Sequence, residues 1–254
     1  MPYEPHPAFT KPDNENAKIW RYMDFTKFVS LLNTKALFFS RADKLRKFDP
    51  FEGSYPVFNV KITEDELRQM IQRKMQEPDI NIDLRQLMVQ YTSRQSLRDV
   101  QKWIFLNCWH INEYESAAMW KLYLQSNEGI AIQSTFKRLA ESFKNVDHEV
   151  NIGIVRYIDY KKDWVPYGNM FYPFLHKRKS YEHEHELRAA DLDVDQPDDI
   201  DGKYISVDID CLIEKIFVSP TSQRWFYTLV KSIVARYALG KDPVMSDLSE
   251  NPVY

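Results

Sequence analysis

Glycine is scarce in this chain, and this scarcity narrows the ways in which it can fold around a nucleotide. Only 6 of the 254 residues are glycine, against roughly 7% in average proteins. No two of them have the G-x-G-x-x-G spacing of a Rossmann turn or the G-x-x-x-x-G-K-[ST] spacing of a P-loop. The G-x-S-x-G and H-E-x-x-H motifs are absent as well. Any nucleotide bound by this chain is therefore held without a glycine-rich cradle.

The composition is that of an ordinary globular protein. Hydrophobic residues make up 44% and charged residues 28% of the chain, and the formal net charge of −3 gives no bulk electrostatic basis for nucleic-acid binding. No run approaches 18 apolar residues, and the polar, proline-rich N-terminal arm, 1–17, lacks the apolar region of a secretory signal. Cys108 and Cys211 stand in apolar runs, which fits a reducing compartment. We expect a cytoplasmic protein that does not associate with membranes.

The order of the predicted elements indicates an α+β fold. Asp24 is placed to cap a helix that follows a strand at 18–23, and Thr63-x-x-Glu66 is a capping-box signature. The polar stretch 63–100 is predicted to be a helical insertion. Short apolar segments predict strands at 36–40, 103–111, 129–133, 186–190, 202–209 and 214–219, and the alternating stretch 150–160 is expected to be the longest strand. Helices are expected at 115–125, 134–143 (capped by Ser134) and 221–239.

Strands and helices in this order do not follow a strict βαβ rhythm. We therefore expect a single α+β domain over 18–240, with a mixed or antiparallel central sheet and flanking helices. The helical insertion at 63–100 interrupts this domain, and a polar tail, 241–254, follows it.

The densest cluster of ionisable residues lies at 176–190. In an extended conformation, Glu182, Glu184, Glu186 and Arg188 project from one face of a strand. At a cleft, such carboxylates provide a general base or orient a sugar hydroxyl. A solvated edge strand that carries charges against aggregation explains the same pattern. Both interpretations stay open at the level of the sequence.

Metal sites find little support. Glu182-x-x-His185 has helical di-metal spacing, but no second Glu-x-x-His exists in the chain. The aspartate-rich run 191–201 lacks the glycine and glutamate that a calcium loop requires. We expect no metal.

Asp49 and Glu52 of the FDPFEG turn are expected to cap that turn.

Further candidates stand on the first two strands and one helix. Arg21 with Tyr22, inside an apolar strand, predicts an anionic partner, either a buried carboxylate or a ligand phosphate. Ser40 with Arg41 closes the second strand, where they would meet a ligand or begin a helix. Trp120 is either a core residue or a stacking platform.

Several of these segments, taken in their order along the chain, resemble those of known families. The segments IWRYMDFTKFVSLLNTKALFFSRADKLRKFDPFEGS, CWHINEYESAAMWKLYLQSNEGIAI and EHEHELRAA resemble a bacterial and phage family of unknown function, over about 18–240. A more distant resemblance is to the ADP-ribosyltransferase fold. That fold begins with a strand bearing Arg or His, continues with a helix and a strand bearing Ser or Tyr, and has a late strand with Glu-x-Glu. Arg21, Ser40 and Glu184-His185-Glu186 occur here in that order.

The second resemblance implies an NAD-consuming ADP-ribosyltransferase or NAD glycohydrolase, a toxin or phage-defence effector. Arg21 would contact the dinucleotide phosphates, and Ser40 would support the nicotinamide pocket. Glu186 would bind the ribose 2′-hydroxyl and stabilise the oxocarbenium-like transition state, while Glu184 would orient the acceptor. The acceptor, nucleic acid or protein, is left open. On this basis we expect Glu186→Gln to abolish nicotinamide release without lowering stability.

Two other functions fit the sequence. In the first, the chain is a non-catalytic module for nucleic acid or protein, in which aromatic residues of 164–172 stack on bases above a basic rim at 176–179. In the second, the same carboxylates bind magnesium in a phosphodiesterase or nuclease.

Overall fold

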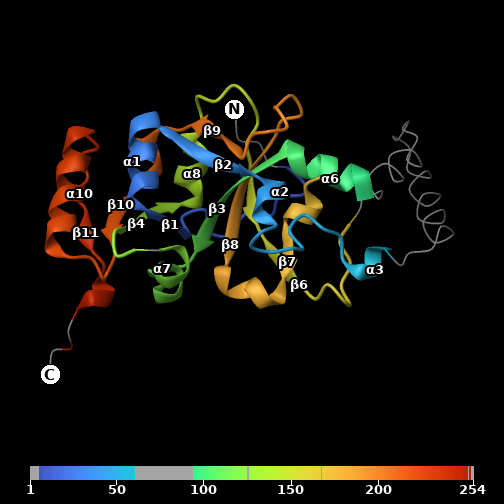
Figure 1. The fold of residues 1–254 in the computed structure, drawn as a ribbon, viewed down its shortest axis with the longest axis horizontal. Coiled ribbons are helices and arrows are strands. Elements are labelled where there is room, and N and C mark those ends of the chain that lie inside the picture. Colours follow the sequence, from blue (N-terminus) through green and yellow to red (C-terminus); the bar gives the residue numbers. More distant parts are fainter. Residues whose placement is uncertain (1–5, 61–93, 125, 167, 251, 253–254) are drawn as a thin grey trace.

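The structure, a computed structural model, describes residues 6–60, 94–124, 126–166, 168–250 and 252. It confirms an α+β fold in which helices flank a mixed, mostly antiparallel sheet (Figure 1). The helical insertion expected at 63–100 lies outside the described residues up to residue 93. Its last part is α6, Arg94–Trp103. Within the described ranges, every helix is too short or too polar to span a lipid bilayer.

The chain begins with a strand, a helix and a strand, as predicted. β1 spans Lys18–Asp24, α1 spans Phe25–Thr34 and β2 spans Ala36–Arg41. The Asp24 side chain accepts a hydrogen bond from the Lys27 amide at 2.8 Å, so it is the N-cap of α1. Lys35 adopts a left-handed conformation (φ 49°) and turns the chain from α1 into β2.

One sheet of nine strands dominates the described part of the chain. Seven strands follow the order β11-β10-β4-β1-β3-β2-β9, while β8 pairs with β3 and β5 pairs with β8. All pairs are antiparallel except β10 with β11. The remaining strands are β3 (Ile104–Ile111), β4 (Gly129–Thr135), β5 (Asn151–Ile154), β8 (Glu186–Leu192), β9 (Gly202–Ser206), β10 (Lys215–Val218) and β11 (Val244–Met245).

The sheet splits along one edge of β3. On its other edge, β3 pairs with β8 from Ile104 to His110 without a break. On the split edge, β2 pairs only near Leu106 and β1 only near His110 and Ile111. Side chains take over the unpaired stretch, because a buried carbonyl needs a donor. Asn107 donates to the Phe38 carbonyl at 2.9 Å, and Arg21 donates to the Cys108 carbonyl at 2.6 Å.

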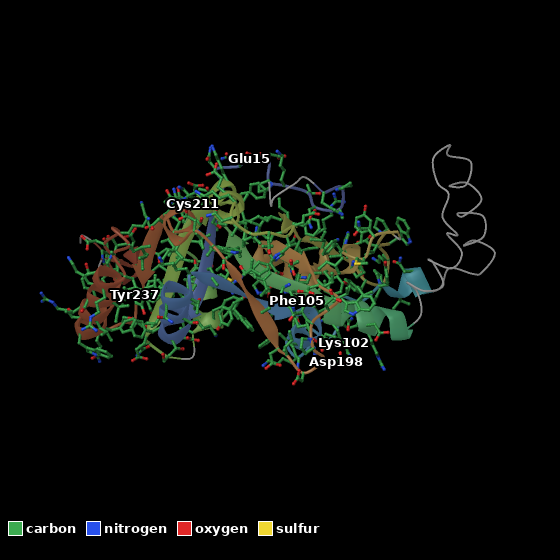
Figure 2. The ribbon with its side chains drawn as sticks, turned by 90° about the horizontal axis from the view of Figure 1, so that it is seen from above. Glu15, Lys102, Phe105, Asp198, Cys211 and Tyr237 are labelled. Carbon is green, nitrogen blue, oxygen red and sulfur yellow. The ribbon has the colours of Figure 1, made fainter. Side chains whose placement is uncertain are left out.

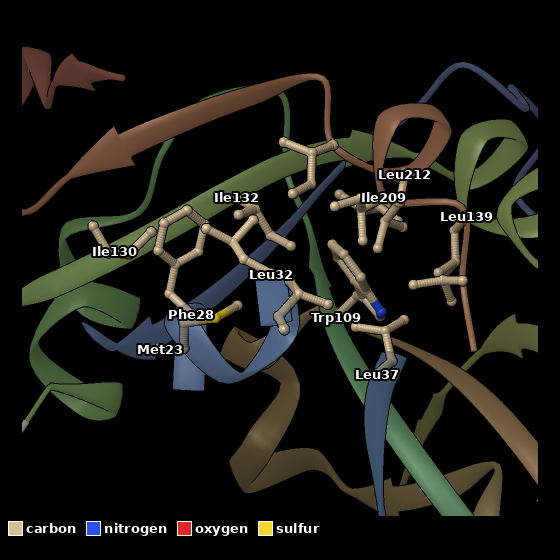
Figure 3. Packing of buried hydrophobic residues seen from close by; sticks show 14 of the residues in the cluster. Met23, Phe28, Leu32, Leu37, Trp109, Ile130, Ile132, Leu139, Ile209 and Leu212 are labelled. Atoms are coloured by element: carbon tan, nitrogen blue, oxygen red, sulfur yellow. The ribbon is translucent and has the colours of Figure 1, made fainter. Parts of the chain in front are cut away.

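Each face of the sheet is covered by its own helices. Residues such as Phe28, Trp109 and Ile132 form the main core under α1, α8 and α10 (Figure 3). Two smaller clusters lie on the opposite face, one under α7 and one near α6. The helices not yet bounded are α2 (Ala42–Leu45), α3 (Val57–Val60), α7 (Ala117–Tyr123), α8 (Phe136–Ser142), α9 (Ile209–Leu212) and α10 (Arg224–Arg236), with 3-10 helices η1 (Tyr172–Phe174), η2 (Lys179–Glu184) and η3 (Asp247–Ser249).

Polar contacts tie the loops to this framework. Lys102 of α6 pairs with Asp198 in the loop between β8 and β9 at 2.9 Å (Figure 2). Asp198 is exposed and Lys102 partly exposed, so the pair contributes little stability. It positions the loop rather than holding the fold together.

Three predicted elements differ from the structure. The stretch 150–160 is not one long strand. The amide of Val155 still bonds to Glu186 of β8, but after it the chain leaves the main sheet. There β6 (Arg156–Ile158) pairs in parallel with β7 (His176–Arg178) in a second sheet. Helix α8 is capped by Thr135, because the Ser134 hydroxyl donates to the Leu212 carbonyl instead. The strand predicted at 202–209 ends at Ser206, and α9 follows.

Replacing Asp24 tests its role as the N-cap of α1. We expect Asp24→Ala to lower the free energy of unfolding by about 1 kcal/mol, because the Lys27 amide loses its acceptor. Asp24→Asn should stay within about 0.5 kcal/mol of the wild type, since asparagine caps equally well. Urea denaturation measures both, and equal losses in the two variants would contradict the capping role.

Candidate functional site

The centre of the candidate site is Arg188, whose guanidinium is completely buried on β8. It forms a bidentate pair with Glu52 at 2.6 and 2.9 Å and a second with Glu186 at 2.9 and 3.0 Å. A further bond reaches the Phe174 carbonyl at 2.6 Å. This geometry satisfies all of its donors, as a buried ion pair requires. The turn 48–53, η1 and β8 therefore meet at one side chain.

Lys177 brings a third carboxylate, Glu184, to this cluster. Its ammonium contacts Glu184, and it lies 3.3 Å from Glu186. His185 adopts a left-handed conformation (φ 39°) between η2 and β8. This bend turns Glu184 back toward Lys177 although it lies outside the strand.

This arrangement corrects the extended register expected for the segment. Strand β8 begins at Glu186, so only Glu186 and Arg188 share its face. Residues 179–184 form η2 instead, and Glu182 is exposed to solvent there. The charges at Glu186 and Arg188 are buried, so a solvated edge strand does not describe them.

The pKa values of Glu184 and Glu186 are shifted in opposite directions. Burial alone would raise the pKa of Glu186, but Arg188 and Lys177 more than offset it and hold this pKa well below its ordinary value. The pKa of Glu184 is raised by burial and by the nearby charge of Glu186, against the opposing effect of Lys177. At neutral pH Glu186 is thus held ionised, while Glu184 binds a proton more readily. Environments that separate two carboxyl groups in this way are typical of acid–base sites.

Three further polar side chains border the carboxylates. The Tyr157 hydroxyl accepts a hydrogen bond from the Glu186 amide at 2.8 Å. The pKa of Tyr123 on α7 is raised by burial of its hydroxyl and by Glu186 and Glu184. Burial and the negative charge of Glu186 raise the pKa of the Cys108 thiol, so it is no nucleophile.

Arg21 lies in the split of the sheet, between β1 and β3. It is half-buried, and its hydrogen bond to the Cys108 carbonyl brings it to the strand residue whose thiol interacts with Glu186. In the described part of the chain, no ion pair involves Arg21. Burial lowers its pKa, so its charge is not fully compensated. A half-buried arginine without a carboxylate is suited to bind an anion.

The other predicted site residues occupy two different places. Tyr22 and Trp120 are buried in the cluster under α7, with ring centroids 5.0 Å apart, and the Tyr22 hydroxyl accepts from the Ser116 amide. Ser40 lies toward the opposite end of β3, where β2 pairs with it. Arg41 is buried and pairs bidentately with Asp43. The structure therefore brings Glu184, Glu186 and Arg188 together. Arg21 reaches only the adjacent Cys108 carbonyl, and Ser40 and Arg41 lie elsewhere.

Sequence reasoning missed the partners that hold this site. Glu52 was expected to cap its turn, yet its carboxylate binds Arg188. Asp49 does cap the turn through the Phe51 amide, and it also pairs with Arg178 at 2.6 Å. The signal for Glu52 was the arginine itself, because a guanidinium in an apolar strand requires a buried carboxylate.

Comparison with known proteins finds no family model, no curated protein and no solved structure that matches this chain. Among the residues that the structure describes, no three or more His, Cys, Asp or Glu side chains are grouped so as to hold a metal ion.

The buried ion cluster predicts a large cost for losing its cation. We expect Arg188→Met to lower the free energy of unfolding by about 3–5 kcal/mol at neutral pH, because Glu52 and Glu186 stay buried without a counter-charge. Arg156→Met, at an exposed arginine, should cost less than about 1 kcal/mol. Urea denaturation measures both.

The stability that Arg188→Met loses should also depend on pH, in a direction that the pKa of Glu186 determines. The wild type owes to the lowered pKa of Glu186 a stabilisation that is present above 4.5, the ordinary value, and is lost as pH falls through the lowered pKa. In Arg188→Met the bare carboxyls take up protons at higher pH, so the deficit should shrink on acidification. A pH-independent deficit would contradict the account.

Proposed function

We propose that this protein cleaves the nicotinamide–ribose bond of NAD and transfers the ADP-ribosyl group, as ADP-ribosyltransferases do, or releases it to water. One observation carries the proposal: the neighbouring carboxylates Glu184 and Glu186 have opposite pKa shifts. Arg21, which has no ion pair in the described part of the chain, bonds to the carbonyl of Cys108, whose thiol interacts with Glu186. The expected acceptor is a nucleic acid or a protein. An effector in a toxin or phage-defence system would use such a reaction.

The carboxylate pair suits the chemistry of this bond. Breaking a glycosidic bond places positive charge on the sugar, and an ionised carboxylate stabilises that charge. Glu186 is kept ionised by Arg188 and Lys177, so it is the residue for this role and for accepting a bond from the ribose 2′-hydroxyl. Glu184, with its raised pKa, is the residue that orients the acceptor.

Arg21 supplies the complementary charge for the dinucleotide. A pyrophosphate carries negative charge and planar arrays of oxygen atoms, which a guanidinium binds with charge-assisted hydrogen bonds. The position of Arg21 in the split of the sheet places it on a strand next to β3. This mode of binding needs no glycine-rich loop, in keeping with the six glycines of the chain.

The alternatives receive less support from the geometry. His176 and Lys177, half of the supposed basic rim at 176–179, are buried, and Lys177 is bound to carboxylates. Phe171 is buried as well, which removes it from a stacking surface.

The two cysteines are free, which favours the cytoplasm as the place of action.

Glu186 provides the main test of the proposed reaction. We expect Glu186→Gln to reduce nicotinamide release from NAD by at least about 100-fold, because the neutral amide cannot stabilise the developing charge. Release is measured by chromatography, with NAD alone and with a cell lysate as a source of acceptors. Release only with lysate would identify a transferase, and release without it a hydrolase.

Glu52→Gln is the matched control. Because each carboxylate is bonded to Arg188, both substitutions should lower stability, which revises the expectation that Glu186→Gln leaves stability unchanged. Only Glu186→Gln should abolish the reaction. Wild-type protein that releases no nicotinamide under either condition, or a fully active Glu186→Gln, would refute the proposal.

Arg21 is tested through binding. We expect Arg21→Gln to weaken the affinity for ADP-ribose by about 10–100-fold, the equivalent of one charge-assisted interaction of about 1.5–3 kcal/mol. Arg156→Gln, an exposed arginine hydrogen-bonded to Thr10, should change the affinity less than about twofold. Isothermal titration calorimetry measures both, and equal affinities for Arg21→Gln and the wild type would remove Arg21 from the site.

A further inference from the structure

His110 is a buried histidine that stands between the two halves of the site. On one side it lies opposite Glu186 in the β3–β8 ladder, and on the other it lies opposite Trp20 of β1, the neighbour of Arg21. Directly opposed residues of an antiparallel pair place their side chains on one face, roughly 5 Å apart at Cβ. The His110 imidazole therefore shares its face of the sheet with the Glu186 carboxylate.

The hydrogen bonds of His110 define its tautomer. Nδ1 lies 2.6 Å from the Glu184 carbonyl. A carbonyl only accepts, so Nδ1 carries the proton and neutral His110 has its free lone pair on Nε2. Nε2 is buried and has no hydrogen-bond partner in the described part of the chain. A buried acceptor without a partner is costly, and it is expected where a ligand completes the site.

The groups around His110 keep the ring neutral. Burial lowers its pKa, the bond to the Glu184 carbonyl opposes this, and the neighbouring His185 and His183 lower it further. The Tyr22 ring from β1 and the His185 ring pack at 6.4 and 6.1 Å, and Glu186 is the opposing carboxylate on β8. At neutral pH the imidazole is thus a base with a free nitrogen.

We propose that His110 is the catalytic base that accepts the proton of the incoming nucleophile, and that this nucleophile is an oxygen with a proton, either an acceptor hydroxyl or water. This inference rests on the proposed function. The ribose C1′–N bond breaks and its electron pair leaves with neutral nicotinamide. The hydroxyl oxygen bonds to C1′, its proton moves to Nε2, and imidazolium returns that proton to solvent.

The same geometry argues for the class of acceptor. A carboxylate acceptor would bring no proton and need no base. It would also approach Glu184 and Glu186, whose charges oppose it. A hydroxyl presents a donor that matches the bare Nε2, so a sugar or side-chain hydroxyl, or water, is the acceptor that this inference assigns in place of a carboxylate.

The experiment compares His110→Gln with His176→Gln. His176 is also buried, and its Nδ1 is held by the Tyr172 carbonyl at 2.7 Å, so the control replaces a similar ring. Nicotinamide release from NAD, with lysate present, is followed from about pH 5 to pH 9, and folding is checked by thermal unfolding. General-base catalysis contributes about 10²–10⁴-fold. We expect His110→Gln to lose about 100-fold or more at neutral pH and to lose the fall in rate toward acid pH, while His176→Gln keeps both.

A second measurement needs no variant. Nitrogen NMR of the histidine rings in the wild type gives the titration of His110. The midpoint of this titration in the NAD-free protein should equal the pKa of the acidic limb in the pH profile of kcat/KM, because that profile reports groups of the free enzyme.

The outcomes separate the two proposals. Wild-type protein that releases no nicotinamide at any pH overturns the proposed function. An active wild type combined with a His110→Gln of equal rate and equal pH profile overturns the role of His110 alone. A His110 midpoint that differs from the acidic limb also overturns that role, even where His110→Gln does not fold.

Discussion

The buried guanidinium of Arg188 is the interaction on which the rest of the described structure depends. Its five bonds reach two carboxylates and one carbonyl, which come from the turn before α3, from β8 itself and from η1. An unpaired charge at this depth would destabilise the fold severely. Burying arginine is tolerable only because every donor finds an acceptor, so this side chain fixes how three distant segments meet.

The split edge of β3 has a second consequence for function. A continuous ladder would have satisfied every backbone group and left nothing for side chains to do. Because β1 and β2 each pair with only one end of β3, Asn107 and Arg21 are drawn inward to complete the bonding. A cation is thereby held at Cys108, whose thiol interacts with Glu186, through a purely structural need. The incomplete pairing of β3 therefore shapes the sheet and also positions Arg21 for the candidate site.

Local signals in the sequence predicted much of the fold. The cap at Asp24, the strands predicted at β3 and β8, and the α+β class are all confirmed. What failed depended on distant partners: β5 and β6 separate because they pair with different strands, and Glu52 finds Arg188 across 136 residues. The placement of Glu184 beside Glu186, and of Arg21 at Cys108, followed from no spacing rule. It results from sheet register and the left-handed bend at His185, which only the folded chain displays.

The depth of the cluster also governs how it responds to its surroundings. Mobile ions screen charges at the surface over a Debye length of roughly 8 Å at physiological ionic strength, but they reach buried pairs far less. The exposed Lys102–Asp198 pair is open to that screening. The field that Arg188 and Lys177 impose on Glu186 originates beneath the surface and is shielded from it. Changes in salt would thus alter the periphery of the molecule while leaving its electrostatic interior almost constant.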